Sequence, residues 1–548
     1  MKVLLVPPTF HYPQEPPLLL SLSDFPAGFA YIAAALKEAG HEVFGLNPNN
    51  AIGSEKNYYL LVNQLFAALQ EIKPDLIGLG GICIDFAFLK DAVELIRKFA
   101  PRTPIVLGGG IITNDREFIF GLLKPDFGIV GEGEETIVQL AKALEAGQRE
   151  FKEIDNLSYW ADGRAIFNPF KPLESYGDVD KRPLPDYEPF GIRDMIDSYS
   201  MATRLLFRYS RTYPRPMTIV TARGCPFNCS FCIHRGNQFY RPRSIKNVME
   251  EIRVNYERYR FNILIILDEL FAVNKQRMRD FCEGVLEGKR LFGWDFDWQF
   301  QTHASARLDY DTLLLAKQAG CVYFSYGIES ASPKVLKSMN KKTDVSQITE
   351  AVRLADSVGI GFGGNLIFGD PAETQLTIYE SLDFFAKYGV SAFIFLSFLR
   401  PYPGNRLFDY CSEKGIIRDK GEYYANIDQA AINMTSLPDS IWYQWTNFFS
   451  ILERSWLWVK DTDAISIDKE EQADPVASYR GASMFKVQAQ CPYCKQAIMF
   501  REMIANNKTE WPLFMGVGCP KCNKRIKINL KLPVENKEQA EEKVAVLV

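Results

Sequence analysis

The chain has 548 residues, of which 47% are hydrophobic and 24% charged, a composition typical of folded globular protein that excludes a disordered chain and a membrane bundle. At about 150 residues per domain, this length predicts three to four domains, which excludes a single small binding module. The formal charge of −4 excludes a general electrostatic attraction to nucleic acid. The apolar opening is too short for a secretory signal and no later run reaches ~18 apolar residues, so we expect a cytoplasmic protein.

Residues 1–147 alternate between short β-branched runs and amphipathic helical stretches, which predicts βαβ units around a parallel sheet. The fold class is therefore α/β, beginning with a doubly wound, Rossmann-like or flavodoxin-like domain. Ligands of such sheets bind outside the carboxyl ends of the strands, and tight turns alone would also explain the glycines found there. The expected strands are 2–6, 41–46, 75–81, 104–110 and 126–134, and the expected helices are 29–40, 58–72, 88–99 and 134–147.

Residues 148–215 hold a possible strand pair and a passage rich in Pro, Asp and Tyr, which we interpret as a linker. Six further strand and helix units over 216–412 predict a partial (β/α)6 barrel, with function on the loops after its strands. Its expected strands are 217–223, 262–270, 297–303, 321–330, 361–369 and 391–398. The rest of the chain divides into a helical region rich in aromatic residues (413–482), a cysteine-containing unit (483–533) and a charged tail (534–548).

Three of the eleven cysteines, Cys225, Cys229 and Cys232, lie in one loop after the first barrel strand, as C-x-x-x-C-x-x-C. Three thiolates can hold three irons of a 4Fe-4S cluster and leave the fourth iron open to a ligand. A zinc knuckle is the alternative, but it would need a fourth ligand, and His234 is poorly spaced for that role.

This cysteine triplet, with aromatic Phe231 before its last member, resembles the radical S-adenosylmethionine (SAM) superfamily. The resemblance implies that the open iron binds SAM and that one electron splits it into methionine and a 5′-deoxyadenosyl radical. It also implies SAM contacts on the loops after the barrel strands, although each of these polar residues could instead be an ordinary surface or capping residue. The implied SAM-binding residues are Phe231, Asp268, Glu269, Arg307, Glu329, Ile367 and Gly369.

In the first domain, Pro7 and Pro8 and the segments at 26–43, 107–115 and 131–137 resemble the cobalamin-binding domain of cobalamin-dependent radical SAM enzymes. There is no D-x-H-x-x-G motif, so His11 and His41 are not expected to bind cobalt. The loop 82–86 is expected under the lower cobalt face, with Cys83 as a buried apolar residue rather than a ligand. The implied cobalamin-binding residues are Pro8, Gly81, Ile82, Ile84, Asp85, Gly108, Gly109, Gly110, Gly131, Glu132, Gly133 and Thr136.

The C-terminal unit contains two C-x-x-C pairs, Cys491 with Cys494 and Cys519 with Cys522. Their spacing predicts a zinc ribbon in which the metal supplies folding energy. A rubredoxin-like iron site that feeds electrons to the cluster is the alternative, but glycine usually follows each rubredoxin knuckle. Nearby Lys524, Arg525 and Lys527 make the unit locally basic, which a solvated surface explains more simply than nucleic acid.

Together these features predict a cobalamin-dependent radical SAM enzyme that methylates an unactivated carbon of a small molecule or peptide. The resemblance implies two molecules of SAM, one as methyl donor to the corrinoid and one as radical source, and an external electron donor of flavodoxin or ferredoxin type. No catalytic side chain is predicted. A cyclase or rearrangement enzyme is the alternative, and a zinc-ribbon scaffold with a degenerate barrel is an alternative of another class. A methylthiotransferase would need three cysteines in the first domain, where only Cys83 occurs.

Overall fold

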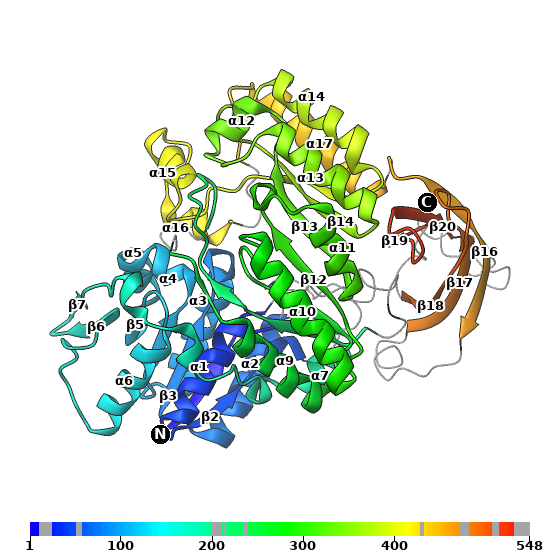
Figure 1. The fold of residues 1–548 in the computed structure, drawn as a ribbon. Helices are drawn as coiled ribbons and strands as arrows, with labels where there is room; N and C mark the ends of the chain where they lie inside the picture. Colours follow the sequence, from blue (N-terminus) through cyan, green and yellow to red (C-terminus); the bar gives the residue numbers. More distant parts are fainter. Residues whose placement is uncertain are drawn as a thin grey trace, which may run out of the picture.

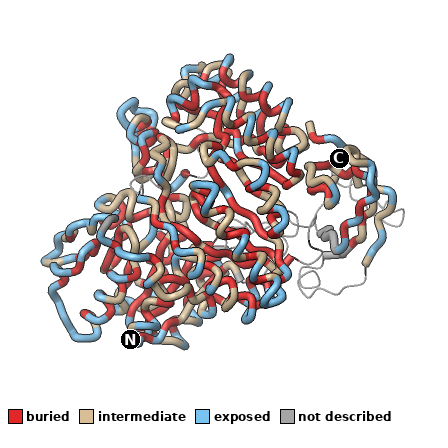
Figure 2. Tube along the Cα trace, viewed as in Figure 1, coloured by how far each residue is buried: buried red, intermediate tan, exposed pale blue. Residues whose placement is uncertain are grey.

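The computed structural model describes residues 1–9, 12, 25–50, 57–198, 211, 214–233, 239–427, 432–456, 458–470, 482–506 and 514–530. Two parallel α/β units lie against each other, and a small C-terminal sheet packs on the second unit (Figure 1). Both units have buried interiors (Figure 2), and one of the hydrophobic cores includes residues of both. No helix in this described part of the chain has the length and apolar character needed to cross a bilayer.

The first unit is a sheet in the order β2-β1-β3-β4-β5-β6-β7, whose first five strands are parallel. All five predicted strands are present, and the order 2-1-3-4-5 is flavodoxin-like. Val3 and Leu5 pack under α1 and α6, whereas Leu4 and Val6 pack under α2, α3 and α5. The bounds are β1 (Lys2–Val6), β2 (Glu42–Gly45), β3 (Leu76–Gly80), β4 (Ile105–Gly108), β5 (Phe127–Ile129), α1 (Ala27–Glu38), α2 (Asn57–Ile72), α3 (Phe86–Phe99), α4 (Gly110–Asn114), α5 (Arg116–Leu123) and α6 (Glu134–Glu145).

Within its described residues, the segment predicted as a linker contains the expected strand pair and a packed helix. Strands β6 (Leu157–Ala161) and β7 (Arg164–Phe167) form a hairpin that extends the first sheet beyond β5. Its turn, Asp162 and Gly163, has positive φ at both residues, as tight hairpins require. Helix α7 (Ile192–Ser198) buries Met195 and Ile196 in the core of the second unit.

The second unit is an all-parallel, six-stranded sheet in the order β15-β14-β13-β12-β11-β8, which confirms the six predicted units of a partial barrel. The short pair β9 (Ala222–Arg223) and β10 (Arg241–Pro242) flanks the cysteine loop. The strands are β8 (Pro216–Ile219), β11 (Ile263–Ile266), β12 (Asp297–Thr302), β13 (Cys321–Glu329), β14 (Gly361–Phe368) and β15 (Phe393–Phe398), and the helices are α9 (Ile245–Tyr259), α10 (Lys275–Phe292), α11 (Tyr310–Gln318), α12 (Pro333–Ser338), α13 (Val345–Val358) and α14 (Gln375–Phe384).

Helices α15 (Arg406–Glu413), α16 (Lys420–Ala425) and α17 (Asp439–Ser455) follow the barrel. The aromatic residues of α17 belong to the core: Trp442 is 1% exposed, and Phe449 stacks on Phe368 at 4.2 Å between ring centroids.

The expectation of helix up to residue 482 is wrong over 461–470, which is strand β16 (Asp461–Glu470). Only Ala464, Ile465 and Ile467 are apolar in this segment, so its sequence carries little strand signal; its pairing with β17 and β20 decides its conformation. The C-terminal sheet has the order β18-β17-β16-β20-β19, with β17 (Ala482–Gln490), β18 (Ala497–Asn506), β19 (Phe514–Gly518) and β20 (Arg525–Asn529).

Candidate active site

A largely apolar cavity of about 570 Å³ lies at the carboxyl ends of β1, β3, β4 and β5. This is where doubly wound sheets bind their ligands. Val220 and Arg223 of the barrel complete its wall, so the cavity faces the second unit. Ten of the residues predicted to bind cobalamin line it: Pro8, Gly81, Ile82, Asp85, Gly108, Gly109, Gly110, Gly131, Glu132 and Gly133.

At two of these glycines, a side chain would meet neighbouring atoms at close range. Gly109 has φ 85°, and a Cβ atom there would lie 2.6 Å from the carbonyl oxygen of Gly81. A Cβ at Gly81 would lie 2.6 Å from a carboxylate oxygen of Asp85, whose side chain accepts a hydrogen bond from the backbone N–H of Ile82 at 2.7 Å. A larger residue at Gly81 or Gly109 would therefore displace the neighbouring loop at the edge of the cavity, so these glycines do more than form turns.

Ile84 and Thr136 lie outside the cavity wall. Ile84 packs against the core beneath the sheet, and the buried Thr136 hydroxyl donates to the carbonyl oxygen of Asp155 at 3.3 Å. The structure adds Phe29, Tyr31 and Asn49 to the wall. Sequence analysis missed them because only the fold brings the start of α1 and the loop after β2 to this edge.

No described residue lining the cavity is a histidine or a cysteine. His41 immediately precedes β2, at the amino ends of the strands and away from the cavity, and Cys83 is 3% exposed within the core. His11 lies outside the described residues. The apolar walls and the glycine edge suit a large flat macrocycle, and they would hold it without an imidazole from the described wall.

The cysteine loop lies between β9 and β10 and is held by hydrogen bonds to its backbone. On one side, the backbone N–H of Ser230 donates to the carbonyl oxygen of Met339 at 2.9 Å, and Asn340 Nδ2 donates to the carbonyl oxygen of Asn228 at 2.7 Å. On the other side, Asn405 Nδ2 donates to the carbonyl oxygen of Phe231 at 2.9 Å. The loop shape is therefore fixed without the thiols.

Cys225, Cys229 and Cys232 form no disulfide and are partly exposed, so iron could reach their thiols. Burial raises the pKa of the Cys225 and Cys229 thiols. Iron binding would therefore have to displace their protons, as it does at thiolate sites generally. His234 lies outside the described residues.

Asp268 supports the start of the cysteine loop. Its carboxylate accepts hydrogen bonds from the backbone N–H and the hydroxyl of Thr221, both at 2.5 Å, and the residue is 1% exposed. Burial raises the pKa of Asp268 to about 6. The structure thus gives this predicted SAM ligand a structural partner, while its neighbour Glu269 is only half-buried and lies close enough to Cys225 to raise the pKa of that thiol.

Glu329 ends β13 with φ 60° and accepts a hydrogen bond from Lys341 Nζ at 2.8 Å in a nearly buried ion pair. Lys341 also lowers the pKa of the Cys225 and Cys229 thiols, against the larger effect of burial. The sequence does not distinguish Lys341, because it stands beside Lys342 in a lysine-rich segment that resembles a solvated surface.

His303, at the end of β12, is a second residue that sequence analysis did not select. Its ring stacks on Phe227 of the cysteine loop at 4.3 Å, and its Nδ1 accepts a hydrogen bond from the backbone N–H of Ser305 at 3.2 Å. Burial lowers the pKa of His303 to about 3, so the ring is neutral and carries its proton on Nε2. That nitrogen is buried and has no partner among the described residues.

The remaining predicted SAM contacts also lie at the carboxyl ends of barrel strands. Phe231 and Ile367 are half-buried against the core shared with the first unit. Gly369 has φ 112° and follows β14, with Trp442 beside it. Arg307 caps a short turn after β12 and has an exposed side chain. Its contact with SAM stays a prediction.

A charged cluster joins the two units at the edge of the cavity. Glu132 lies 2.9 Å from Arg223 and 3.3 Å from Arg182, and it also pairs with Arg241. Arg223 pairs with Glu134 at 2.6 Å. Burial raises the pKa of Glu134, but the positive charges of Arg223 and Arg182 outweigh burial and hold this pKa below its ordinary value. Because Arg223 is two residues before Cys225, this ion-pair network at the edge of the cavity reaches the start of the cysteine loop.

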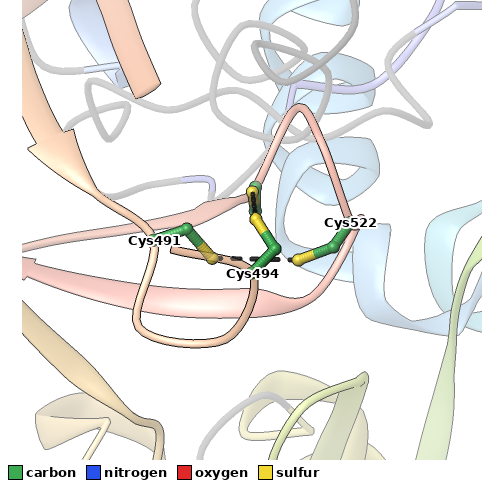
Figure 3. Close-up of side chains that lie close together, drawn as sticks. Cys491, Cys494 and Cys522 are labelled. Carbon is green, nitrogen blue, oxygen red and sulfur yellow. Dashed lines mark hydrogen bonds between the residues drawn. The ribbon is translucent and has the colours of Figure 1, made fainter. Parts of the chain in front are cut away.

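The four C-terminal cysteines converge as the spacing predicts, and Figure 3 labels three of them, Cys491, Cys494 and Cys522. Their sulfur atoms all lie within 4.8 Å of one another, and Cys491 to Cys522 and Cys494 to Cys519 are each 3.8 Å apart. A tetrahedron with metal–sulfur bonds of ~2.3 Å has sulfur–sulfur edges of about 3.8 Å. The site is therefore shaped for one tetrahedral metal ion.

The C-terminal sheet docks at the amino ends of β14 and β15. Arg525 is 2% exposed, its guanidinium lies 3.7 Å from the ring centroid of Trp456, and its backbone N–H donates to the carbonyl oxygen of Ser391 at 2.9 Å. Asn523 Nδ2 donates to the carbonyl oxygen of Gly359, and Lys524 pairs with Asp356. Two of the basic residues are thus docking contacts, and the metal site lies on the opposite end of the barrel from the cysteine loop.

Comparisons with known proteins agree with this arrangement. The family model of the radical SAM superfamily matches residues 219–385, and that of the B12 binding domain matches residues 24–141. An uncharacterized methyltransferase of Pyrococcus horikoshii is 28% identical over 76% of this chain and 84% of its own length. The anaerobic magnesium-protoporphyrin IX monomethyl ester cyclase of Cereibacter sphaeroides is 27% identical over 70% of this chain and 59% of its own length.

Among solved structures, the radical SAM methyltransferase TsrM of Kitasatospora setae, with cobalamin and a 4Fe-4S cluster bound, shares the fold. Its TM-score is 0.58 at 19% identity, over 75% of each chain. The chain thus contains both predicted units in the expected order. The cavity of the first unit faces the barrel near the cysteine loop. This chain therefore belongs to the cobalamin-dependent radical SAM enzymes.

Proposed function

We propose that the protein is a methyltransferase that acts on an unactivated carbon of a small molecule or peptide. The observation that carries the proposal is the cavity of the first unit, which opens toward Arg223, two residues before the cysteine loop. The similarity to the methyltransferase of P. horikoshii supports it. When bound, the cluster and SAM would supply a radical and the corrinoid would supply a methyl group.

The residues of the chain would bind and orient these groups rather than perform the difficult chemistry. Cys225, Cys229 and Cys232 would hold the cluster, and the glycine edge at Gly81 and Gly109 would carry the corrinoid. Lys341 and the neutral His303 place two N–H donors near the cysteine loop, where they could orient polar groups of SAM. Such positioning contributes several kcal/mol to catalysis when it holds reactants in a reactive arrangement.

Product analysis under anaerobic conditions tests this function. With SAM, hydroxocobalamin, dithionite and candidate substrates, a methyltransferase should form both 5′-deoxyadenosine and S-adenosylhomocysteine, because one SAM is split and another loses its methyl group. Cys225→Ala, Cys229→Ala or Cys232→Ala should each abolish deoxyadenosine formation, whereas Cys411→Ala, which removes a buried thiol elsewhere, should keep it. Deoxyadenosine formation in any of the three loop variants would contradict the cluster assignment.

A cyclase is the second candidate, and the similarity to the C. sphaeroides cyclase favours it. It would form deoxyadenosine without S-adenosylhomocysteine, so the same assay distinguishes the two. In either case the enzyme would need an external one-electron donor, and we infer a donor of flavodoxin or ferredoxin type in the cytoplasm.

We also propose that the four C-terminal cysteines bind zinc and that the ion stabilises the sheet against the barrel. Their shared geometry supports one tetrahedral ion, and Lys495 and Asn523, both at positive φ, take the positions where rubredoxins usually have glycine. A role in electron delivery is disfavoured because the sheet docks at the far ends of strands such as β14, whose 8 residues span about 26 Å.

Elemental analysis of a variant without the cluster tests the zinc site. The triple variant Cys225→Ala, Cys229→Ala, Cys232→Ala should retain about one zinc per chain, and adding Cys491→Ala should remove it. Cys491→Ala alone should lower the unfolding temperature of the C-terminal unit and leave dithionite-driven SAM cleavage largely unchanged. Iron in place of zinc in the triple variant would overturn the assignment.

A further inference from the structure

A basic surface lies directly beside the cysteine loop, on α12 and the turn that follows it. Residues 333–344 contain four lysines and one acidic residue, Asp344. Lys334, Lys337 and Lys342 are exposed. None of these three makes an ion pair in the described part of the chain, whereas Lys341 is turned inward and paired with Glu329. The three exposed ammonium groups are therefore available to a partner.

The same segment forms the closest support of the cysteine loop. Asn340 donates to the carbonyl oxygen of Asn228, which precedes Cys229, and the carbonyl oxygen of Met339 accepts from the backbone N–H of Ser230. A surface hollow of about 470 Å³ is lined by Leu336, Lys337, Asn340 and Lys342, among others. Asn340 thus belongs to the hollow and contacts the loop, so a single residue separates this surface from the cluster-binding segment.

The other side of the loop is covered. Asn405 contacts Phe231, and Asn114 of α4 donates to the carbonyl oxygen of Ile233 at 3.0 Å. Contacts from the first unit and from the loop after β15 thus cover residues 231–233. The side formed by α12 remains outside these contacts, and Figure 1 shows α12 at the periphery of the barrel.

We propose that this surface, defined by Lys334, Lys337 and Lys342, is the docking site of an acidic one-electron carrier protein. This inference rests on the proposed function, which requires one electron per SAM cleaved. The donor would lose one electron and the oxidised cluster held by the three cysteines would gain it, with no bond made at this step. Electron-transfer partners form small, transient interfaces, and opposite charges at such interfaces chiefly raise the rate of association.

Binding and turnover of the full-length protein test the proposal, with reduced flavodoxin as the probe. The variant Lys334→Glu, Lys337→Glu, Lys342→Glu should bind flavodoxin at least about tenfold more weakly at low ionic strength, with and without the cluster. Its flavodoxin-driven deoxyadenosine formation should fall accordingly, while dithionite-driven formation should be unchanged. Added salt should weaken binding to the wild type far more than to the variant.

The matched control is Lys90→Glu, Lys142→Glu, Lys152→Glu, which reverses three exposed lysines of the first unit. It should keep wild-type flavodoxin binding. Unchanged binding in the α12 variant, or an equal loss in the control, would overturn the docking surface. If the wild-type protein forms no deoxyadenosine with dithionite, the proposed function is refuted. The binding measurement would still show whether flavodoxin docks on the α12 surface.

Discussion

Individual side chains near the cysteine loop hold its backbone in place by hydrogen bonds. Asp268 is the clearest case, because it accepts two from Thr221. The sequence correctly predicts that the Asp268 carboxylate follows the second barrel strand. It does not predict which group hydrogen-bonds to that carboxylate. Whether such a group meets a ligand or a neighbouring loop depends on backbone that is distant in sequence, here Thr221. His303 and Lys341 show the same limit, because their burial and contacts exist only in the fold.

The pKa of Asp268, raised from 3.8 to about 6 by burial, makes a prediction for stability. Between pH 4 and 6 the folded protein retains a proton that the unfolded chain has released, so this group lowers stability as the pH rises through that range. Asp268→Asn cannot titrate, and its unfolding temperature relative to wild type should therefore rise between pH 4.5 and 7. A difference that does not change with pH would contradict the assignment.

Asp268→Ala should act differently, because it leaves the Thr221 N–H buried without its acceptor. That loss costs about 1–3 kcal/mol and should loosen the start of the cysteine loop. We expect less iron and sulfide per chain after reconstitution than in Asp268→Asn.

At the level of elements, regular periodicity was sufficient to predict the strands of both parallel sheets, because each is a buried apolar run followed by an amphipathic helix. It was insufficient for β16 and for the place of the β6–β7 hairpin, where partners distant in the chain decide the outcome. The C-x-x-C spacing predicted a metal knuckle, but the docking of Arg525 beneath Trp456 has no signal in the sequence.

The turn between β4 and α4 allows a test at this scale. In Gly109→Ala, the new residue would have to adopt an unfavourable positive φ, and its Cβ atom would also clash with Gly81. In Gly147→Ala, φ is also positive, but no atom lies within 4 Å of the new Cβ. Corrinoid binding measured by absorbance should be lost in the first variant and kept in the second. Dithionite-driven SAM cleavage should survive in both, because the cysteine loop is untouched.

For the whole molecule, the charged cluster around Glu132 links the two units. Glu132→Gln would leave Arg182, Arg223 and Arg241 close together with less compensating charge, and breaking a largely buried pair typically costs 3–5 kcal/mol. We expect corrinoid affinity to fall at least tenfold and proteolysis between the units to increase. Glu135→Gln is the control, since Glu135 is 46% exposed and lies 3.6 Å from Arg182.

Because Arg223 pairs with Glu132 and Glu134 of the first unit and stands two residues before Cys225, we expect binding in the cavity to restrict the motion of the cysteine loop. Thermodynamic reciprocity then requires that assembly of iron and sulfide strengthens corrin uptake by the same factor as corrin uptake strengthens iron and sulfide retention. Such coupling would lower the fraction of molecules that hold the cluster without the corrinoid. In those molecules a radical would form with no methyl donor beside it.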